Sequence, residues 1–393
     1  MEPMLRFKAD DGSDFPDWEE MTLGELFYIS AGGDIDKNNC AVKQSKDYPY
    51  PIYANALVNG GLYGYTNYYK IDGDTFTVTG RGDVGHAVAR HCKYVPIVRL
   101  LVCRPNMDDD VDFFAEQINY TRIFIESTGV PQLTAPQLSK TKVKRPSLPE
   151  QRKIADLLSA VDDVIAAQEA EVAAWEKRKK GVMQKLFSQE VRFKADDGSD
   201  FPDWESTTVG ELFTFVTEKN ESGRISDVIT NSAEHGLIPQ REYFDKDIAV
   251  EGNTEGYTVI HKGDFVYNPR KSTIAPFGPF NIYERDEVGI VSPLYTCLTP
   301  RDGETAPYLS WYFKTSRWHR YIVTHGAQGG ARHDRVGMTN ALMKGIPVML
   351  PSLPEQRKIA DCLTSLDDVI AKAKDELDAW RELKKGLLQQ MFV

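Results

Sequence analysis

The sequence predicts an α+β protein in which two globular heads are joined by two long antiparallel coiled-coil helices, with a pseudo-twofold internal repeat. A first peptide is repeated: residues 6–19 read RFKADDGSDFPDWE, and residues 192–205 read the same letters. A second repeated phrase, SLPEQRKIAD, stands at residues 147–156 and 352–361, and a heptad pattern follows each copy. A period of about 200 residues is too long for a solenoid, so the repeat indicates a duplicated domain pair.

Composition and charge fit a globular protein rather than one that coats nucleic acid or crosses a membrane. Of 393 residues, 41% are hydrophobic and 27% are charged, and the net charge is −11. No apolar run is long enough for a membrane span, and the charged N-terminal sequence does not match a signal peptide. The five cysteines show no CxxC spacing. We therefore expect a reduced, cytoplasmic chain that holds no metal.

The first long helix is predicted over residues 147–187. Seam residues recur in alternating steps of four and three, which is typical of a coiled coil. The seam consists of Ile154, Leu158, Val161, Ile165, Gln168, Val172, Trp175, Lys179, Val182 and Leu186. Ser147 and Glu150 have the spacing of a capping box, which predicts where the helix begins.

The second long helix is predicted over residues 352–393, with Ser352 and Glu355 as its cap pair. Its seam consists of Ile359, Leu363, Leu366, Ile370, Ala373, Leu377, Trp380, Lys384, Leu387 and Met391. Each helix follows its own head, and neither can bury its apolar stripe alone. We therefore expect antiparallel pairing, which gives a rod of about 60 Å with a head at each end.

The domain organisation follows from these boundaries. The predicted segments are a first head at 1–146, a first helix at 147–187, a connector repeat at 188–205, a second head at 206–351 and a second helix at 352–393. The heads hardly match in sequence between their identical flanks. Apolar and β-branched runs predict strands at 75–79, 95–102, 257–260, 265–267 and 290–298, and short helices at 112–120 and 308–321.

Polar loops in both heads carry side chains that suit nucleic-acid recognition. Arginine pairs with guanine, asparagine or glutamine with adenine, and lysine with phosphate. The loops at 79–85, 268–273 and 328–335 supply Arg81, Asn268, Arg270, Lys271, Ser272, Gln328, Arg332 and Arg335. Each copy also becomes basic before its SLPEQRKIAD phrase, which adds Lys140 and Lys142. The alternatives are ordinary turns for the loops and solvated faces for the basic stretches.

Signatures of catalysis are missing from the sequence. It has no GxxxxGK[ST] phosphate loop, no GxSxG elbow and no HExxH helix. Neither half clusters an acid, a base, a nucleophile or a metal set, so we expect a protein that is not an enzyme.

The duplicated heads, the duplicated helices and the phrase Pro-Ser-Leu-Pro-Glu-Gln-Arg-Lys-Ile-Ala, at 146–155 and 351–360, resemble one family. They are similar to the specificity subunit of type I restriction–modification systems. The resemblance implies that each head is a target recognition domain for one half of a bipartite DNA sequence. It also implies that the helices dock two DNA methyltransferase (modification) subunits and, through them, restriction subunits. The docking candidates are Gln168, Trp175, Lys179, Trp380 and Lys384.

The same resemblance implies that S-adenosylmethionine, ATP and Mg²⁺ bind to the partner subunits and not to this chain. Because the heads differ, we expect two different half-sites separated by about 5–8 unread base pairs. The alternative is a non-catalytic coiled-coil adaptor whose two heads bind proteins. It would give no shift of DNA, even with modification subunits present.

Overall fold

The computed structural model describes residues 3–121, 132–243, 254–326 and 334–392. The chain forms two compact units, each of which contains one head and a part of both long helices. Unit 1 comprises Met1–Ala170 and Lys374–Val393, and unit 2 comprises Glu171–Ala373. The compact units therefore divide within the long helices, whereas the sequence-based segments separate the heads from the helices.

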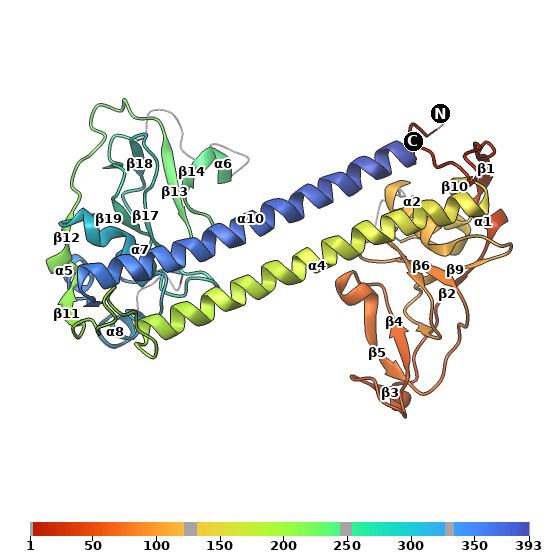
Figure 1. The fold of residues 1–393 in the computed structure, drawn as a ribbon, viewed down its shortest axis with the longest axis horizontal. Helices are drawn as coiled ribbons and strands as arrows, with labels where there is room; N and C mark the ends of the chain where they lie inside the picture. Colours follow the sequence, from red (N-terminus) through yellow and green to blue (C-terminus); the bar gives the residue numbers. More distant parts are fainter. Residues whose placement is uncertain (1–2, 122–131, 244–253, 327–333, 393) are drawn as a thin grey trace. The chain divides into compact units, whose positions relative to one another are not determined.

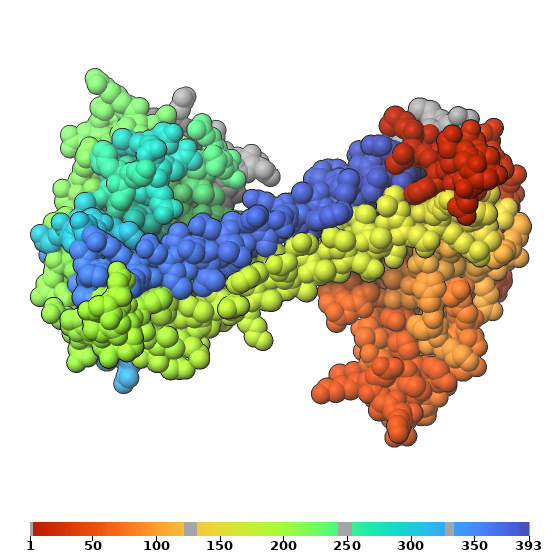
Figure 2. All heavy atoms as spheres, viewed as in Figure 1, coloured from red at the N-terminus to blue at the C-terminus, as the bar shows by residue number. Residues whose placement is uncertain are grey.

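The two long helices are α4 (Leu148–Phe187) and α10 (Leu353–Met391). In unit 1 the start of α4 lies along the end of α10 (Figures 1 and 2). Lys384 Nζ lies 2.8 Å from the Asp162 carboxylate, and Arg381 lies 2.7 Å from Glu169. Rising numbers on α4 therefore face falling numbers on α10, so the helices are antiparallel. In unit 2 the same two helices are joined by an ion pair between Lys179 and Asp367.

The heptad seam predicts most of the buried positions on these helices. The buried seam residues of α4 are Ile154, Leu158, Val161, Val172 and Leu186, and those of α10 are Ile359, Leu363, Ile370, Ala373, Leu377 and Met391. Burial of these residues stabilises the helices, because helical stability in proteins comes mainly from packing of the apolar face.

The capping boxes expected at the helix starts are not formed. The carboxylate of Glu150 is fully buried, and it accepts bonds from Arg6 Nε at 3.0 Å and Trp18 Nε1 at 3.1 Å. The Ser147 hydroxyl is buried without a hydrogen-bond partner among the described residues. A long-range ion pair thus takes the carboxylate that a local cap would have used.

The second copy repeats this arrangement with nearly the same distances. Arg192 Nε donates to Glu355 at 3.0 Å, and Trp204 Nε1 donates to it at 3.1 Å. Each repeated peptide makes one further ion pair with its helix: Lys153 pairs with Asp10, and Lys358 pairs with Asp196, each at 2.6 Å. The repeated peptide is therefore a clamp on the first turns of each long helix, which explains why both pieces recur together.

Head 1, residues 19–145, begins and ends in one antiparallel pair, β1 (Glu19–Thr22) with β10 (Lys142–Arg145). Its proximal sheet has the order β2-β9-β6-β7, and α2 packs between this sheet and α4. Its distal sheet, β3-β5-β4-β8, lies farther from the long helices (Figure 1). The bounds are β2 Phe27–Ala31, β3 Cys40–Ala41, β4 Tyr50–Tyr53, β5 Leu62–Thr66, β6 Thr75–Val78, β7 Ala87–Arg90, β8 Val95–Pro96, β9 Leu101–Pro105 and α2 Val111–Thr121.

Head 2, residues 205–350, is built on the same plan. The pair β11 (Glu205–Thr208) with β20 (Pro347–Leu350) joins the head to α10, and the proximal sheet has the order β12-β19-β16-β17. The distal sheet has the order β14-β13-β18-β15. The bounds are β12 Phe213–Phe215, β13 Val228–Ser232, β14 Gly236–Pro239, β15 Thr258–Ile260, β16 Phe265–Tyr267, β17 Phe280–Ile282, β18 Gly289–Val291, β19 Thr296–Pro300, α7 Ala306–Phe313 and α8 His319–His325.

The distal sheets share three strands and differ in the fourth. In each head a hairpin, β4-β5 or β13-β14, pairs in parallel with a later strand, β8 or β18. Head 1 adds β3 beside β5, whereas head 2 adds β15 beside β18. Heads that hardly match in sequence are thus variants of one fold, as expected for a duplicated domain pair.

Shorter elements complete both heads. They are α1 Leu23–Leu26, η1 Lys37–Asn39, η2 Val58–Gly61, α3 Ala135–Leu138, α5 Val209–Leu212, α6 Gln240–Tyr243, η3 Gly303–Thr305 and α9 Asn340–Lys344. Three sequence-based elements are each divided in the structure. The strand expected at 95–102 is β8 and the start of β9, that at 290–298 is β18 and β19, and the helix expected at 308–321 is α7 and α8. Within the described residues no helix has the length and apolarity of a membrane span.

Candidate nucleic-acid interface

The first candidate surface is the loop Thr79–Gly85, which leaves the end of β6 and presents Arg81 to solvent. Thr79 anchors the start of the loop: its amide donates to His86 O at 2.9 Å, and its hydroxyl accepts from His86 N at 2.9 Å. Gly82 has φ +70°, which suits a residue without a side chain. Both ends of the loop are therefore fixed, and the arginine stands at its exposed tip.

Gly80 allows close backbone packing behind this arginine. Its carbonyl accepts from Leu133 N at 2.9 Å, and its amide donates to Asn55 Oδ1 at 2.7 Å. A Cβ at this position would lie 2.8 Å from the Leu133 carbonyl oxygen, which is too close for any other residue. Glycine thus lets the segment after α2 pass directly beneath the loop.

The second candidate surface is the loop 268–273, which leaves the end of β16 in head 2. Arg270, Lys271 and Ser272 are exposed. Lys271 N donates to Asp334 O at 2.8 Å, and Val336 N donates to Pro269 O at 2.9 Å. Asp334 and Arg335, the described end of the loop singled out at 328–335, therefore lie beside the loop 268–273, with Arg270 and Arg335 as bridge partners.

The arginines of the two loops occupy the same place in the two heads. Arg81 is the third residue after β6, and Arg270 is the third residue after β16; both strands hold the same place in their proximal sheets. In both heads a later segment pairs with the residue just before the arginine, through Leu133 in head 1 and Val336 in head 2. We call Thr79–Gly85 and Asn268–Thr273 the arginine loops.

Asn268 differs from the other candidates because it is buried. Only 9% of the residue is exposed. Its Nδ2 donates to Asn231 O at 3.1 Å, and its Oδ1 accepts from Arg270 N at 3.0 Å. These contacts assign Asn268 to holding the loop beneath Arg270 rather than to an exposed contact with DNA.

The remaining candidates are scattered. Lys140 is exposed in the turn before β10, and Lys142 on β10 forms an ion pair with Glu20 at 2.6 Å. Gln328 and Arg332 lie outside the described residues. Of the candidates that are described, the structure brings together Arg270, Lys271, Ser272 and Arg335 in head 2, whereas in head 1 Arg81 and Lys140 are exposed on separate segments.

The basic stretch before α4 is not the free cationic surface that the sequence indicated. Arg145 Nε lies 2.8 Å from the buried Asp109 carboxylate. Lys153 holds Asp10, as described above, and its side chain also reaches Lys8 O at 3.0 Å. Several of these cations therefore stabilise the joint between head, clamp and helix, and fewer remain for a phosphate backbone.

Two asparagines that the sequence analysis missed connect each distal sheet to the arginine loop. Asn55 follows β4 and bonds Gly80 N and Val98 O, at 2.7 and 2.5 Å. Asn231 lies on β13, donates to Val266 O at 2.7 Å and accepts from Asn268 Nδ2. The signal was present as a similar pattern on the first strand of each distal hairpin: YAN at 53–55 begins at the end of β4, and ITN at 229–231 lies within β13.

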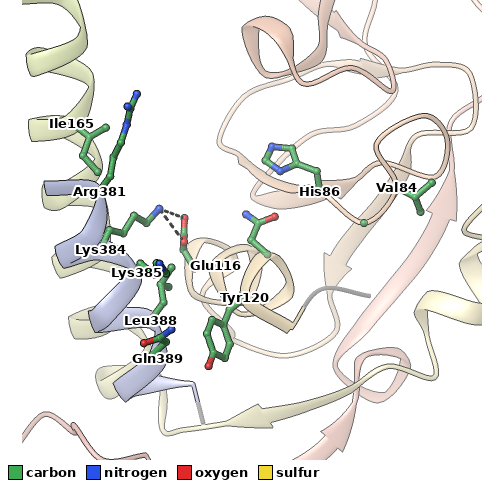
Figure 3. A pocket seen from close by; sticks show the side chains of 12 residues that line it. Val84, His86, Glu116, Tyr120, Ile165, Arg381, Lys384, Lys385, Leu388 and Gln389 are labelled. Carbon is green, nitrogen blue, oxygen red and sulfur yellow. Dashed lines mark hydrogen bonds and ion pairs between the residues drawn. The ribbon is translucent and has the colours of Figure 1, made fainter. Parts of the chain in front are cut away.

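Each unit also has a groove between its head and the long helices, with charged side chains in its lining. In unit 1 the groove has a volume of about 910 Å³, and Lys384 of α10 reaches from one wall to Glu116 of α2 (Figure 3). His86 and Tyr120 lie on the head side of the groove. Lys384 Nζ lies 3.1 Å from Glu116 and 2.8 Å from Asp162. Burial raises the pKa of Glu116, and Lys384 opposes that shift.

The groove of unit 2 contains different chemistry at the matching point. Lys179 stands where Lys384 stands in the repeat, and it pairs with Asp367. On the head side it meets the ring of Trp311, 4.6 Å from the centroid, and Lys314 lies over the same ring at 4.1 Å. Lys179 and Lys384 thus connect head and helices within their units. The other two docking candidates at matched positions, Trp175 and Trp380, are half-buried on the helices.

The described residues contain no group of three or more histidine, cysteine or acidic side chains that could hold a metal. His91 has two acidic partners, Asp74 and Asp112, at 3.0 and 2.9 Å. Burial of the His91 ring opposes its protonation, but the hydrogen bonds to both aspartates outweigh burial and raise its pKa.

The chain thus contains two variants of one fold, each of which exposes an arginine loop and packs on the paired long helices. A family model described as the type I restriction modification DNA specificity domain matches residues 16–174 and 202–379. The chain belongs to this family. It is a non-catalytic specificity subunit of a restriction–modification system, which the adaptor alternative does not explain.

Individual relatives agree with this assignment. A Methanocaldococcus jannaschii protein provisionally named the MjaX specificity subunit is 23% identical over 437 residues, which cover 98% of this chain and 95% of that protein. A Mycoplasma pneumoniae protein, provisionally named a type I specificity subunit, is 29% identical over 119 residues. That match covers 30% of this chain and only 33% of the relative.

The fold is similar to that of a solved specificity subunit. The S subunit of the type I restriction–modification system of M. genitalium matches with a TM-score of 0.61 at 16% identity, over 100% of this chain and 99% of that one. The likeness confirms the α+β fold with two repeated domains and long helices.

Proposed function

We propose that this chain selects an asymmetric bipartite DNA target, with head 1 contacting one half-site through Arg81 and head 2 contacting the other through Arg270. The observation that carries the proposal is the matched position of these two exposed arginines on heads that otherwise differ. No ion pair with either guanidinium is found among the described residues, so both are available to an outside acceptor. Arginine in a bidentate contact with guanine is the commonest specific contact in the major groove.

The unlike surroundings of the two arginines support an asymmetric target. In head 2, Lys271 and Arg335 stand beside Arg270. In head 1, glycines flank Arg81 on both sides. A twofold protein with equal heads would favour a palindromic target, whereas two unequal loop surfaces favour two different half-sites.

We infer that the long helices dock two DNA methyltransferase subunits, and that restriction subunits join through them. The clamp at each helix start has the same contacts in both units, which supports two equivalent docking surfaces. Trp175 and Trp380, at the same position in the two repeats, remain the aromatic candidates for docking, with Gln168 as a further candidate. S-adenosylmethionine would bind to the methyltransferases, and ATP and Mg²⁺ to the restriction subunits, in a cytoplasmic complex.

The test is methylome sequencing of a strain that carries this chain and its modification subunit and no other such system. Arg81→Ala is expected to relax one half-site and Arg270→Ala the other, each by about 1–3 kcal/mol of discrimination. Matched controls are Arg104→Ala and Arg301→Ala, exposed arginines at the other ends of β9 and β19. Uniform loss over all sequences would indicate phosphate contacts, and unchanged half-sites for both loop variants would refute the proposal.

A further inference from the structure

In each head, a four-residue turn breaks what the sequence predicts to be one long strand. In head 1 the turn is Ile97–Leu100, between β8 and β9, and Leu100 N donates to Ile97 O at 3.1 Å. In head 2 the turn is Ser292–Tyr295, between β18 and β19, and Tyr295 N donates to Ser292 O at 2.9 Å. The turns join the distal to the proximal sheet at the same point of the fold, and we call them the sheet-joining turns.

Each sheet-joining turn lies against the arginine loop of its own head. In head 1 one side chain, Asn55, bonds both the Val98 carbonyl and the Gly80 amide. A Cβ on Gly80 would also lie 3.3 Å from the Arg99 carbonyl oxygen, so the two backbones are in contact. In head 2 Asn268 Nδ2, at the start of the arginine loop, lies 3.4 Å from the Tyr295 hydroxyl.

The tips of these turns point to solvent and differ between the heads. In head 1 Val98 is 49% exposed, and Arg99 beside it is exposed as well. In head 2 the tip carries Pro293 and Leu294, and Leu294 is 56% exposed. A leucine that is more than half exposed contributes little to the core of its own head.

The turn in head 1 is also held in an unfavourable backbone conformation. Val98 and Arg99 have φ of +52° and +60°, a region that a β-branched residue rarely adopts. Bonds from Val98 N to Gly33 O and from Arg99 N to Gly32 O, each 3.0 Å, fix it there. Strain of this kind persists only where the surroundings over-determine it, and it gathers at ligand-contacting sites.

We propose that the sheet-joining turns are a second DNA-contacting element, in which Arg99 contacts a guanine of the first half-site and Leu294 contacts a thymine methyl of the second. The inference rests on the proposed function of the arginine loops and extends it. Arginine and apolar side chains recognise these two groups in the major groove. The two heads would then differ in specificity at one matched position, where a charged tip replaces an apolar one.

The experiment uses this chain in complex with its modification subunit and the duplex target identified by methylome sequencing. For Arg99, each guanine of the first half-site is replaced in turn by 7-deazaguanine, which lacks the N7 acceptor. For Leu294, each thymine of the second half-site is replaced by uracil, which lacks the methyl group. Affinities are measured for the native sequence, Arg99→Ala, Leu294→Ala and the control variants Arg104→Ala and Val323→Ala, which change exposed side chains on other elements.

We expect that 7-deazaguanine at one position lowers the DNA affinity of the native complex about tenfold, and that the same substitution does not change the DNA affinity of the Arg99→Ala complex. We expect one uracil position to weaken the native complex about threefold to tenfold and to have no effect on Leu294→Ala. The control variants should respond to both probes as the native complex does. Such coupling reports a direct contact, because a variant that only loosened the head would leave the probe's effect in place.

One result would overturn the inference, and it is distinct from failure of the proposed function. If both turn variants keep the full response at every substituted base, the turns do not contact the bases. If Arg81→Ala and Arg270→Ala still relax their half-sites in that case, the arginine loops remain the recognition element and only the turn proposal fails. If neither loop variant changes its half-site, the proposed function itself fails.

Discussion

Units 1 and 2 are nearly identical where the chain repeats itself and diverge where head meets helix. The clamp ion pair is 2.9 Å between Arg6 and Glu150 and 2.8 Å between Arg192 and Glu355. Across the groove, by contrast, the seam lysine meets a carboxylate in unit 1 and a tryptophan in unit 2. The difference teaches that the repeat preserves how a helix begins, whereas each head is fitted to that helix by its own side chains.

The largest effect is expected from removing the buried carboxylate of either clamp. Glu150→Ala leaves Arg6 and Trp18 without their shared acceptor and should destabilise unit 1 by about 3 kcal/mol. Because the contacts of Glu355 match, Glu355→Ala should cost unit 2 the same amount. Denaturant-dependent hydrogen exchange of α2 and of α7 measures the two units separately. A difference of more than about 1 kcal/mol between the two variants would show that the clamps are not equivalent.

The second largest effect is expected from replacing the groove lysines, Lys384 and Lys179, which should destabilise the two units by different amounts. Lys384→Met leaves Glu116 and Asp162 facing one another, and Glu116 is only 19% exposed, so we expect a loss of about 2 kcal/mol. Lys179→Met leaves only Asp367, which is 39% exposed and can be hydrated, so we expect a loss below about 1 kcal/mol.

The pH dependence of the stability of Lys384→Met provides a control for this prediction. Burial raises the pKa of Glu116 above its unfolded value, so its ionisation costs stability as the pH rises. Without Lys384 that pKa should rise further, and lowering the pH from about 7 to about 5 should recover part of the lost stability. Equal losses for Lys384→Met and Lys179→Met at both pH values would contradict the proposed difference between the grooves.

Smaller losses of stability are expected from replacing the matched asparagines, Asn231 in head 2 and Asn55 in head 1. Asn231 is 3% exposed, and Asn231→Ala would remove its bond to the Val266 carbonyl and one of the two bonds that the Asn281 amide donates, at a cost of about 2 kcal/mol. Asn55 is partly exposed, so water can replace its bonds and Asn55→Ala should cost about 1 kcal/mol. Thermal unfolding measures both, and a reversed order would contradict the view that Asn231 has the more structural role.

The sequence predicted the long helices and their pairing because a heptad pattern over forty residues has one dominant solution. The sequence-based prediction failed at the start of α4. There the Glu150 carboxylate accepts a hydrogen bond from the distant Arg6 instead of forming the expected capping box. It also failed at the sheet-joining turns. Val98 and Arg99 are residues that no turn rule favours, so the strand appeared continuous, although Ser292-Pro293 did carry a turn signal in the second head.

The sequence predicted which residue types form the candidate site, but it did not predict how these residues lie on the surface of each head. The arginines stood out because glycine, proline and polar residues surround them, but their equivalence depends on strand order, which the unlike sequences conceal. Asn268 looked like its neighbours in sequence, and only its burial against Asn231 separates it from them. Local composition thus identifies loops, whereas the role of each side chain depends on the sheet packed beneath it.

The smallest expected effect is a pH-dependent contact confined to head 1. His91 bonds Asp74 and, across to α2, Asp112, and head 2 has Pro307 near the start of its corresponding helix α7. The raised pKa of His91 means that this contribution to stability is complete below about pH 6.5 and is lost as the pH rises through the folded-state pKa.

The matching variant is His91→Gln, which keeps a polar side chain but cannot become charged. The melting temperature of the native chain should exceed that of the variant at about pH 6, and the two should converge by about pH 8.5, because the neutral ring loses its attraction to both carboxylates. Hydrogen exchange should confine the difference to β7 and α2 and leave head 2 unchanged. A constant difference across this range would mean that His91 acts by packing, since packing does not depend on the charge of the ring.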